Sequence, residues 1–198
     1  MFLVSIFAIL INSIIHDNNA IAETYTLNLK KDVNLISIPF KYSNINTAAN
    51  LIDLIPGCNQ VKYWDVFEQS FIEYNLDAND KNFSIIPGYP YAVRLESDID
   101  YKVSGEVYAY PYFILMQTKT TNLNFVTLPF DKTDIKSAEQ LANDIPNCDT
   151  IWCWNEENQA YLGHPVGSDI NNFTVTPGNV YIINVTQNGI WHLDDTPP

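Results

Sequence analysis

The feature that most constrains this chain is a match of the sequence to itself at an offset of 90 residues. Residues 34–40 (NLISIPF) align without gaps on 124–130 (NFVTLPF), and 87–91 (PGYPY) align on 177–181 (PGNVY). Identical pairs continue along the same register at Ile45/Ile135, Ala48/Ala138, Leu51/Leu141, Cys58/Cys148, Trp64/Trp154, Gln69/Gln159, Asn82/Asn172 and Phe83/Phe173. Such a match predicts one backbone formed twice, so each element can be derived from two sequences.

The spacing of apolar residues predicts strands and one short helix in each copy. Both copies begin with a segment that alternates apolar and small residues and ends near a proline, as buried strands do. Apolar residues three and four positions apart then predict helices over 45–55 and 135–145, with Asn44 or Asp134 as the N-cap. The other expected strands are 60–66, 69–74, 90–96 and 100–108, matched by 150–156, 159–163, 180–186 and 189–193.

We therefore expect a mainly β (α+β) fold of two tandem β-rich units, residues 24–108 and 114–198. Each unit is expected to contain about five strands and one short helix. Apolar residues make up 46% of the chain and aromatic residues 13%, which is enough material for packed cores.

Residues 1–22 have the pattern of a secretory signal peptide. An apolar run from Phe2 to Ile15 is followed by polar residues and by the small-x-small sequence Ala20-Ile21-Ala22. The run is too short to span a bilayer comfortably, and no later segment is apolar enough to be a candidate. We expect cleavage before Glu23 and a secreted, periplasmic or cell-surface protein.

The charge of the chain excludes one class of partner. Lys and Arg number 10 against 23 Asp and Glu, which gives a net charge of −13. Because a surface this acidic repels phosphate backbones and no basic cluster offsets it, nucleic acid is not expected as a partner.

Segments 34–39 (NLISIP) with 87–93 (PGYPYAV), and 124–129 (NFVTLP) with 177–183 (PGNVYII), resemble a known module. This is the NLISIP…PGxxY tandem repeat module of secreted and cell-surface proteins of bacteria and archaea. The resemblance covers nearly the whole chain after residue 22. It implies an accessory or surface module, and it brings no family catalytic residues. Phe125 stands where the module has Leu, a change that we expect to concern core packing alone.

The three cysteines leave alternatives open. An exported protein meets an oxidising compartment, so a disulfide is expected, either Cys148–Cys153 or Cys58–Cys148. The equally weighted alternative is that the thiols are free and fill gaps in the core. The chain contains no C-x-x-C sequence, which argues against a zinc or redox site.

Aromatic residues divide into those that recur in both copies and those that do not. Trp64/Trp154, with the recurring Phe and Tyr pairs, are expected to be buried core residues. Trp152 and Trp191 replace Lys62 and Tyr101, so they are the candidate ligand contacts. A position that accepts Lys in one copy is expected to face solvent, and exposed aromatic residues often mark sugar or protein contacts.

No pattern of catalytic residues is present. His164 and His192 have no partner at metal-ligand spacing and are expected at the surface, and no Ser lies in a nucleophile elbow. We therefore expect no enzyme activity, no cofactor and no metal. The predicted function is a non-catalytic module pair for assembly, adhesion or protein–protein contact, and the alternative is carbohydrate binding through aromatic side chains. The expected partners are accordingly a protein or a cell-surface glycan.

Overall fold

The computed structural model describes residues 23–41, 45–78, 81–108, 110–118 and 121–193. The expected signal peptide lies outside these residues. The described chain is mainly β with two short helices, which confirms the predicted fold class. Its elements are β1 Glu23–Leu29, β2 Asp32–Ser37, β3 Phe40–Lys41, α1 Ala48–Leu54, β4 Cys58–Asp65, β5 Ser70–Asn75, β6 Pro90–Leu95, β7 Ile99–Val107, β8 Tyr112–Leu115, β9 Leu123–Thr127, α2 Ala138–Asp144, β10 Cys148–Asn155, β11 Ala160–Pro165, β12 Val180–Val185 and β13 Gly189–His192.

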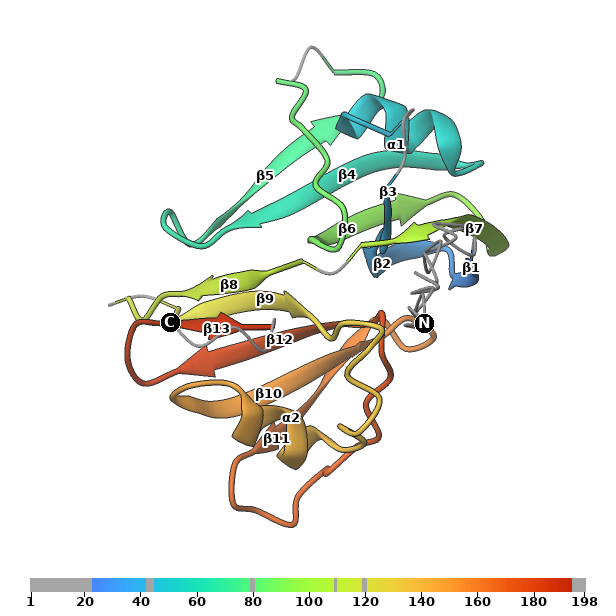
Figure 1. The fold of residues 1–198 in the computed structure, drawn as a ribbon. Helices are drawn as coiled ribbons and strands as arrows, with labels where there is room; N and C mark the ends of the chain where they lie inside the picture. Colours follow the sequence, from blue (N-terminus) through green and yellow to red (C-terminus); the bar gives the residue numbers. More distant parts are fainter. Residues whose placement is uncertain (1–22, 42–44, 79–80, 109, 119–120, 194–198) are drawn as a thin grey trace, which may run out of the picture.

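Each half of the chain forms its own four-stranded antiparallel sheet. The strand orders are β2-β6-β4-β5 in unit 1 (β1–β7) and β9-β12-β10-β11 in unit 2 (β8–β13), and they correspond strand by strand. β1 pairs with β7, which also pairs with β3, and β8 pairs with β13, so each named strand pairs within its own unit. In Figure 1, α1 and α2 lie at opposite ends of the molecule, and the two units meet between them. The sequence prediction had omitted β1, β3 and β8.

The helices begin three residues later than predicted. Thr47 and Ser137, and not Asn44 and Asp134, are the N-caps. Their hydroxyl oxygens accept the backbone N–H of Asn50 and Gln140, which satisfies a donor that the first turn leaves without a partner. Each helix covers one face of its sheet and belongs to a separate apolar core, one in each unit.

The asparagine that opens the NLISIP segment is a buried structural residue in both units. The side chain of Asn34 accepts the N–H of Lys30 and donates to the Lys30 carbonyl, at 2.8 and 2.7 Å. The side chain of Asn124 makes the equivalent bonds to the backbone of Met116, at 2.7 and 3.2 Å. Each asparagine therefore holds the turn that leads into the first strand of its sheet.

The PGxxY segment is likewise explained by backbone geometry. The hydroxyls of Tyr91 and Tyr181 accept the N–H of Ile86 and Thr176, each at 2.7 Å. Gly178, with φ of +88°, lies against the Phe130 ring, and an added Cβ would collide with that ring. The contacts of these motif residues are structural, and none of them indicates a catalytic or binding role.

Two side chains of unit 1 bind the backbone of one residue of unit 2. The indole N–H of Trp64 donates to the carbonyl of Leu123 at 2.8 Å. The side-chain amide of Gln69 donates to the same carbonyl at 3.1 Å and accepts the Leu123 N–H at 2.9 Å. Both free backbone groups of this residue on edge strand β9 are thereby satisfied.

Unit 2 makes the same contact in return. Trp154 donates its indole N–H to the carbonyl of Val33 at 2.8 Å, and Gln159 accepts the Val33 N–H and donates to its carbonyl, both at 3.0 Å. We call these paired contacts the reciprocal clasp. The expectation that the recurring tryptophans are buried core residues is confirmed for the burial of Trp64. It is wrong about their place, because both indoles lie between the units, where Trp154 is only half-buried.

The clasp predicts a specific stability cost. Gln159→Ala leaves the N–H of Val33 without its partner, so we expect it to lower the free energy of unfolding by about 1–3 kcal/mol. Gln69→Ala should cost a similar amount, because it removes the corresponding bond to Leu123. Urea unfolding measures both, with Gln187→Ala in an exposed turn as the control, expected within about 0.5 kcal/mol of the wild type. Equal stability of the Gln159 and Gln187 variants would contradict the clasp.

Candidate functional site

The two four-stranded sheets face each other with the surfaces that do not cover their own cores. β2 contacts β12 and β6 contacts β9, so the edge strands and their neighbours meet across the junction. Away from this contact the sheets leave two hollows, of about 200 and 360 Å³. Phe71 of β5 and Tyr161 of β11 line both hollows, so the hollows meet at these two rings. We call the two hollows together the inter-unit groove.

The hollow on unit 2 is almost entirely apolar. Its walls include Trp152, Phe125 and Ile182 from unit 2 and Trp64 from unit 1. Phe125 stacks near Trp64, with ring centroids 5.4 Å apart. The expectation that Phe125 concerns core packing is therefore wrong, since this ring lines the groove.

The hollow on unit 1 has the equivalent position but a mixed lining, with polar side chains among apolar ones. Gln60, Lys62 and Arg94 line it together with Leu35 and Trp154. Lys62 occupies the place that Trp152 has in unit 2, and its ammonium lies 2.7 Å from the Glu73 carboxylate on the neighbouring strand.

Trp152 and Trp191, the two candidate ligand contacts, lie in different environments. Trp152 is half-buried on the groove wall, and its indole lies over Gly163, the residue opposite it on β11. Trp191 is only 2% exposed, and its indole N–H donates to the carboxylate of Asp144 at 2.9 Å. The expectation that Trp191 contacts a ligand is wrong, because this side chain is part of the unit 2 core.

The three cysteines are free thiols. Cys148 and Cys153 lie five residues apart on β10, a distance of roughly 16 Å at about 3.3 Å per residue. This separation is far beyond the roughly 7 Å between Cα atoms that a disulfide allows. Cys58 belongs to the core of unit 1, whereas Cys148 packs against the core of unit 2, so the second candidate pair is not formed either. Burial raises the pKa of the Cys58 thiol to about 11 and that of Cys148 to about 12.

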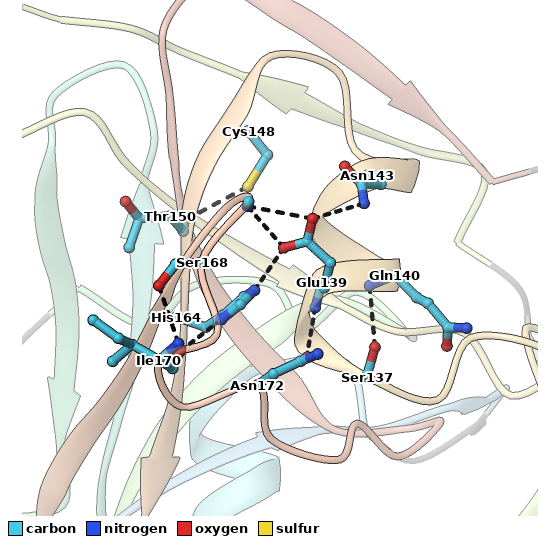
Figure 2. A network of polar contacts seen from close by, with 11 residues as sticks. Ser137, Glu139, Gln140, Asn143, Cys148, Thr150, His164, Ser168, Ile170 and Asn172 are labelled. Atoms are coloured by element: carbon cyan, nitrogen blue, oxygen red, sulfur yellow. Dashed lines mark hydrogen bonds and ion pairs between the residues drawn. The ribbon is translucent and has the colours of Figure 1, made fainter.

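A polar network in unit 2 was not expected from the sequence. His164 is fully buried, and not at the surface as predicted. Figure 2 shows its ring between the Ile170 carbonyl and the Glu139 carboxylate, with Nδ1 and Nε2 each 2.7 Å from its partner. Glu139 also accepts the N–H of Gly167 at 3.0 Å and a side-chain N–H of Asn143 at 3.1 Å. The network ties α2 to the loop that follows β11.

Both neighbours of the His164 ring are hydrogen-bond acceptors. The two nitrogens can therefore both donate only when the imidazole is protonated. Burial alone lowers the pKa of His164, but the bonds to the Ile170 carbonyl and the Glu139 carboxylate outweigh it and raise the pKa above 6.5. The Gly167 N–H and the His164 ring lower the pKa of Glu139 below 4.5. Because a ring so enclosed cannot touch a substrate, its role is structural.

A second surface is formed by the outward side of the two-stranded β8–β13 sheet. Tyr112, Ile114 and Ile190 are 43%, 40% and 46% exposed, and they form cross-strand neighbours with His192. We call these four residues the β8–β13 face. A small hollow of about 130 Å³ adjoins it, lined by Tyr112, Ile114 and Phe67 among others.

Sequence comparison of the two copies missed this face because the register changes before it. Leu29 pairs with Ile99 and Leu115 pairs with Gly189, so β8 matches β1 at an offset of 86 residues while β13 matches β7 at 90. An ungapped comparison at 90 residues therefore aligns β8 with the wrong residues. A four-residue gap before Asn124 would have revealed it.

Among the described residues, no group of three His, Cys, Asp or Glu side chains is arranged to bind a metal. Neither helix in the described part of the chain is long and apolar enough to cross a bilayer. No protein-family model, curated protein or solved structure matches this chain. The groove and the β8–β13 face are therefore interpreted from their own geometry.

The His164 network predicts how stability depends on pH. The raised pKa of His164 means that its contribution is complete below pH 6.5 and is lost as pH rises through the folded-state value. The lowered pKa of Glu139 means that its contribution is complete above pH 4.5 and is lost on acidification. We expect the wild type to exceed His164→Gln in unfolding free energy by the largest margin between these values. The margin should shrink as the pH rises above 6.5, and urea unfolding at pH 5.5 and 8.5 measures it. A constant margin would contradict the assignment.

Proposed function

We propose that this protein is a non-catalytic, exported module pair whose role is protein–protein contact through the β8–β13 face. The observation that carries this proposal is that the two units place different residues at equivalent positions of the same backbone. Thr26, Asn28, Asp100 and Lys102 of unit 1 occupy the pairing positions that Tyr112, Ile114, Ile190 and His192 occupy in unit 2. The fold accepts polar residues at these positions, so packing does not require the apolar ones.

An apolar surface that the fold does not need supports a contact with another molecule. Burying apolar area contributes roughly 25 cal/mol per Å², so three exposed side chains on adjacent strands can anchor an interface. The hollow beside Tyr112 and Ile114 offers a place for an anchoring side chain, as the centres of protein interfaces do.

The charge of the chain favours a different protein over a second copy. With a net charge of −13, two copies repel each other, whereas a partner with a basic rim around an apolar patch is attracted. The non-catalytic assignment is supported by the raised pKa values of Cys58 and Cys148 and by the complete burial of His164. Export is supported by the signal-peptide pattern of residues 1–22.

Site-specific cross-linking in the organism of origin tests this function. A photoreactive residue at position 190 should give one protein adduct, and the same residue at the matched position 100 should give none. Ile114→Thr should reduce the adduct at 190 several-fold, because Thr removes apolar contact while keeping a β-branched side chain.

The oligomeric state completes this test. The purified chain should sediment as a monomer, because its net charge opposes self-association. A dimer that Ile114→Thr dissociates would show that the face pairs with its own copy and would contradict the choice of partner. Equal cross-linking from positions 190 and 100 would contradict the role of the face itself.

A further inference from the structure

The inter-unit groove is another candidate binding surface, and its apolar end shares Trp64 and Phe125 with the hollow beside the β8–β13 face. Its two hollows are related by the same offset that relates the units, because Leu35, Lys62 and Trp154 line one and Phe125, Trp152 and Trp64 line the other. Their volumes, about 360 and 200 Å³, meet at Phe71 and Tyr161, and the larger alone is in the range of small-molecule sites. An elongated ligand can therefore occupy both.

The chemistry of the groove changes along its length. At one end aromatic rings dominate, and at the junction Tyr161 is 57% exposed. At the other end Gln60, Lys62 and Arg94 provide hydrogen-bond donors and acceptors. A matching ligand needs apolar faces that stack on rings and polar edges that reach amide and charged groups. Sugar rings combine an apolar face with a rim of hydroxyl groups.

The charges in the groove are already compensated. Lys62 pairs with Glu73 at 2.7 Å, and Arg94 lies 3.7 Å from the carboxylate of Asp32. An ionic ligand would have to break one of these pairs, or bring a like charge to it. Hydroxyl groups both donate and accept, so they can bond to either member of a pair without separating it. This arrangement favours a neutral ligand.

The reciprocal clasp argues against a peptide as the occupant. A peptide strand binds a sheet by hydrogen bonds to a free edge. At the two edges that meet at the junction, the N–H and carbonyl groups of Val33 and Leu123 are bonded to Gln159, Trp154, Gln69 and Trp64. A backbone entering here would have to displace these side chains, whereas a ligand that contacts side chains alone would not.

We propose that the inter-unit groove binds a neutral oligosaccharide. Sugar rings stack on Tyr161 and Phe71 at the centre and on Trp152 at the apolar end, and their hydroxyls bond to Gln60, Lys62 and Arg94 at the other end. Trp152 contributes here because Gly163, the residue opposite it, leaves room for the indole close to the backbone of β11.

Titration calorimetry of the mature full chain tests the proposal. The probes are neutral hexasaccharides of glucose, mannose and N-acetylglucosamine, with an oligogalacturonate as the acidic comparison. At least one neutral probe should bind, and it should bind more tightly than the acidic oligogalacturonate does. Tyr161→Ala should weaken that binding by about tenfold or more, because it removes the most exposed stacking ring.

A matched control separates this site from the protein-contact face. Tyr112→Ala removes a ring of similar exposure from the β8–β13 face and should leave sugar binding unchanged. If Tyr161→Ala lowers the unfolding temperature, Trp152→Leu provides a second groove variant with the same expected loss. Absence of binding to every neutral probe, binding to the acidic probe alone, or unchanged affinity in both groove variants would each overturn the proposal. None of these results would bear on the cross-linking from position 190.

Discussion

The rest of the structure depends on how two edge strands satisfy their backbone. An exposed edge presents unpaired N–H and carbonyl groups and invites pairing with another chain. In this protein Val33 on β2 and Leu123 on β9 have both groups bonded by a Trp and a Gln of the opposite unit. Because the contact is reciprocal, it holds the two sheets face to face and fixes where the groove between them lies.

Two sequences on one backbone separate structural residues from candidate binding residues. Residues that recur, such as Asn34/Asn124 and Tyr91/Tyr181, bond to nearby backbone and define turns. Among the residues that differ, His164 and Trp191 are buried, but others lie on surfaces where the fold has no requirement. In the groove, Lys62 of unit 1 corresponds to Trp152 of unit 2, and on the outer face Asn28 corresponds to Ile114. Both proposals of function rest on this second kind of position.

The sequence predicted the fold class and approximate positions of most elements, because apolar spacing and proline and glycine signals are local. The prediction omitted β8 because this strand is a short apolar run that does not alternate with polar residues. It also omitted β1, although Tyr25, Leu27 and Leu29 do alternate with polar residues there. The prediction assigned the recurring tryptophans to the cores of the units. A residue that recurs in both copies can be buried either in its own unit or against the other unit, and the sequence does not distinguish the two. His164 was missed for a similar reason, since its partners Glu139 and Ile170 are brought near only by the fold. Trp191 was misplaced because exposure depends on the strand register.

Amide hydrogen exchange at Val33 and Leu123 tests the reciprocal clasp most directly. Edge-strand amides that point to solvent exchange quickly, whereas hydrogen-bonded amides exchange only when the structure opens. The account predicts slow exchange at both positions in the wild type. In Gln69→Ala it predicts fast exchange at Leu123 with Val33 still protected, and in Gln159→Ala the reverse. Fast exchange at both positions in the wild type would contradict it.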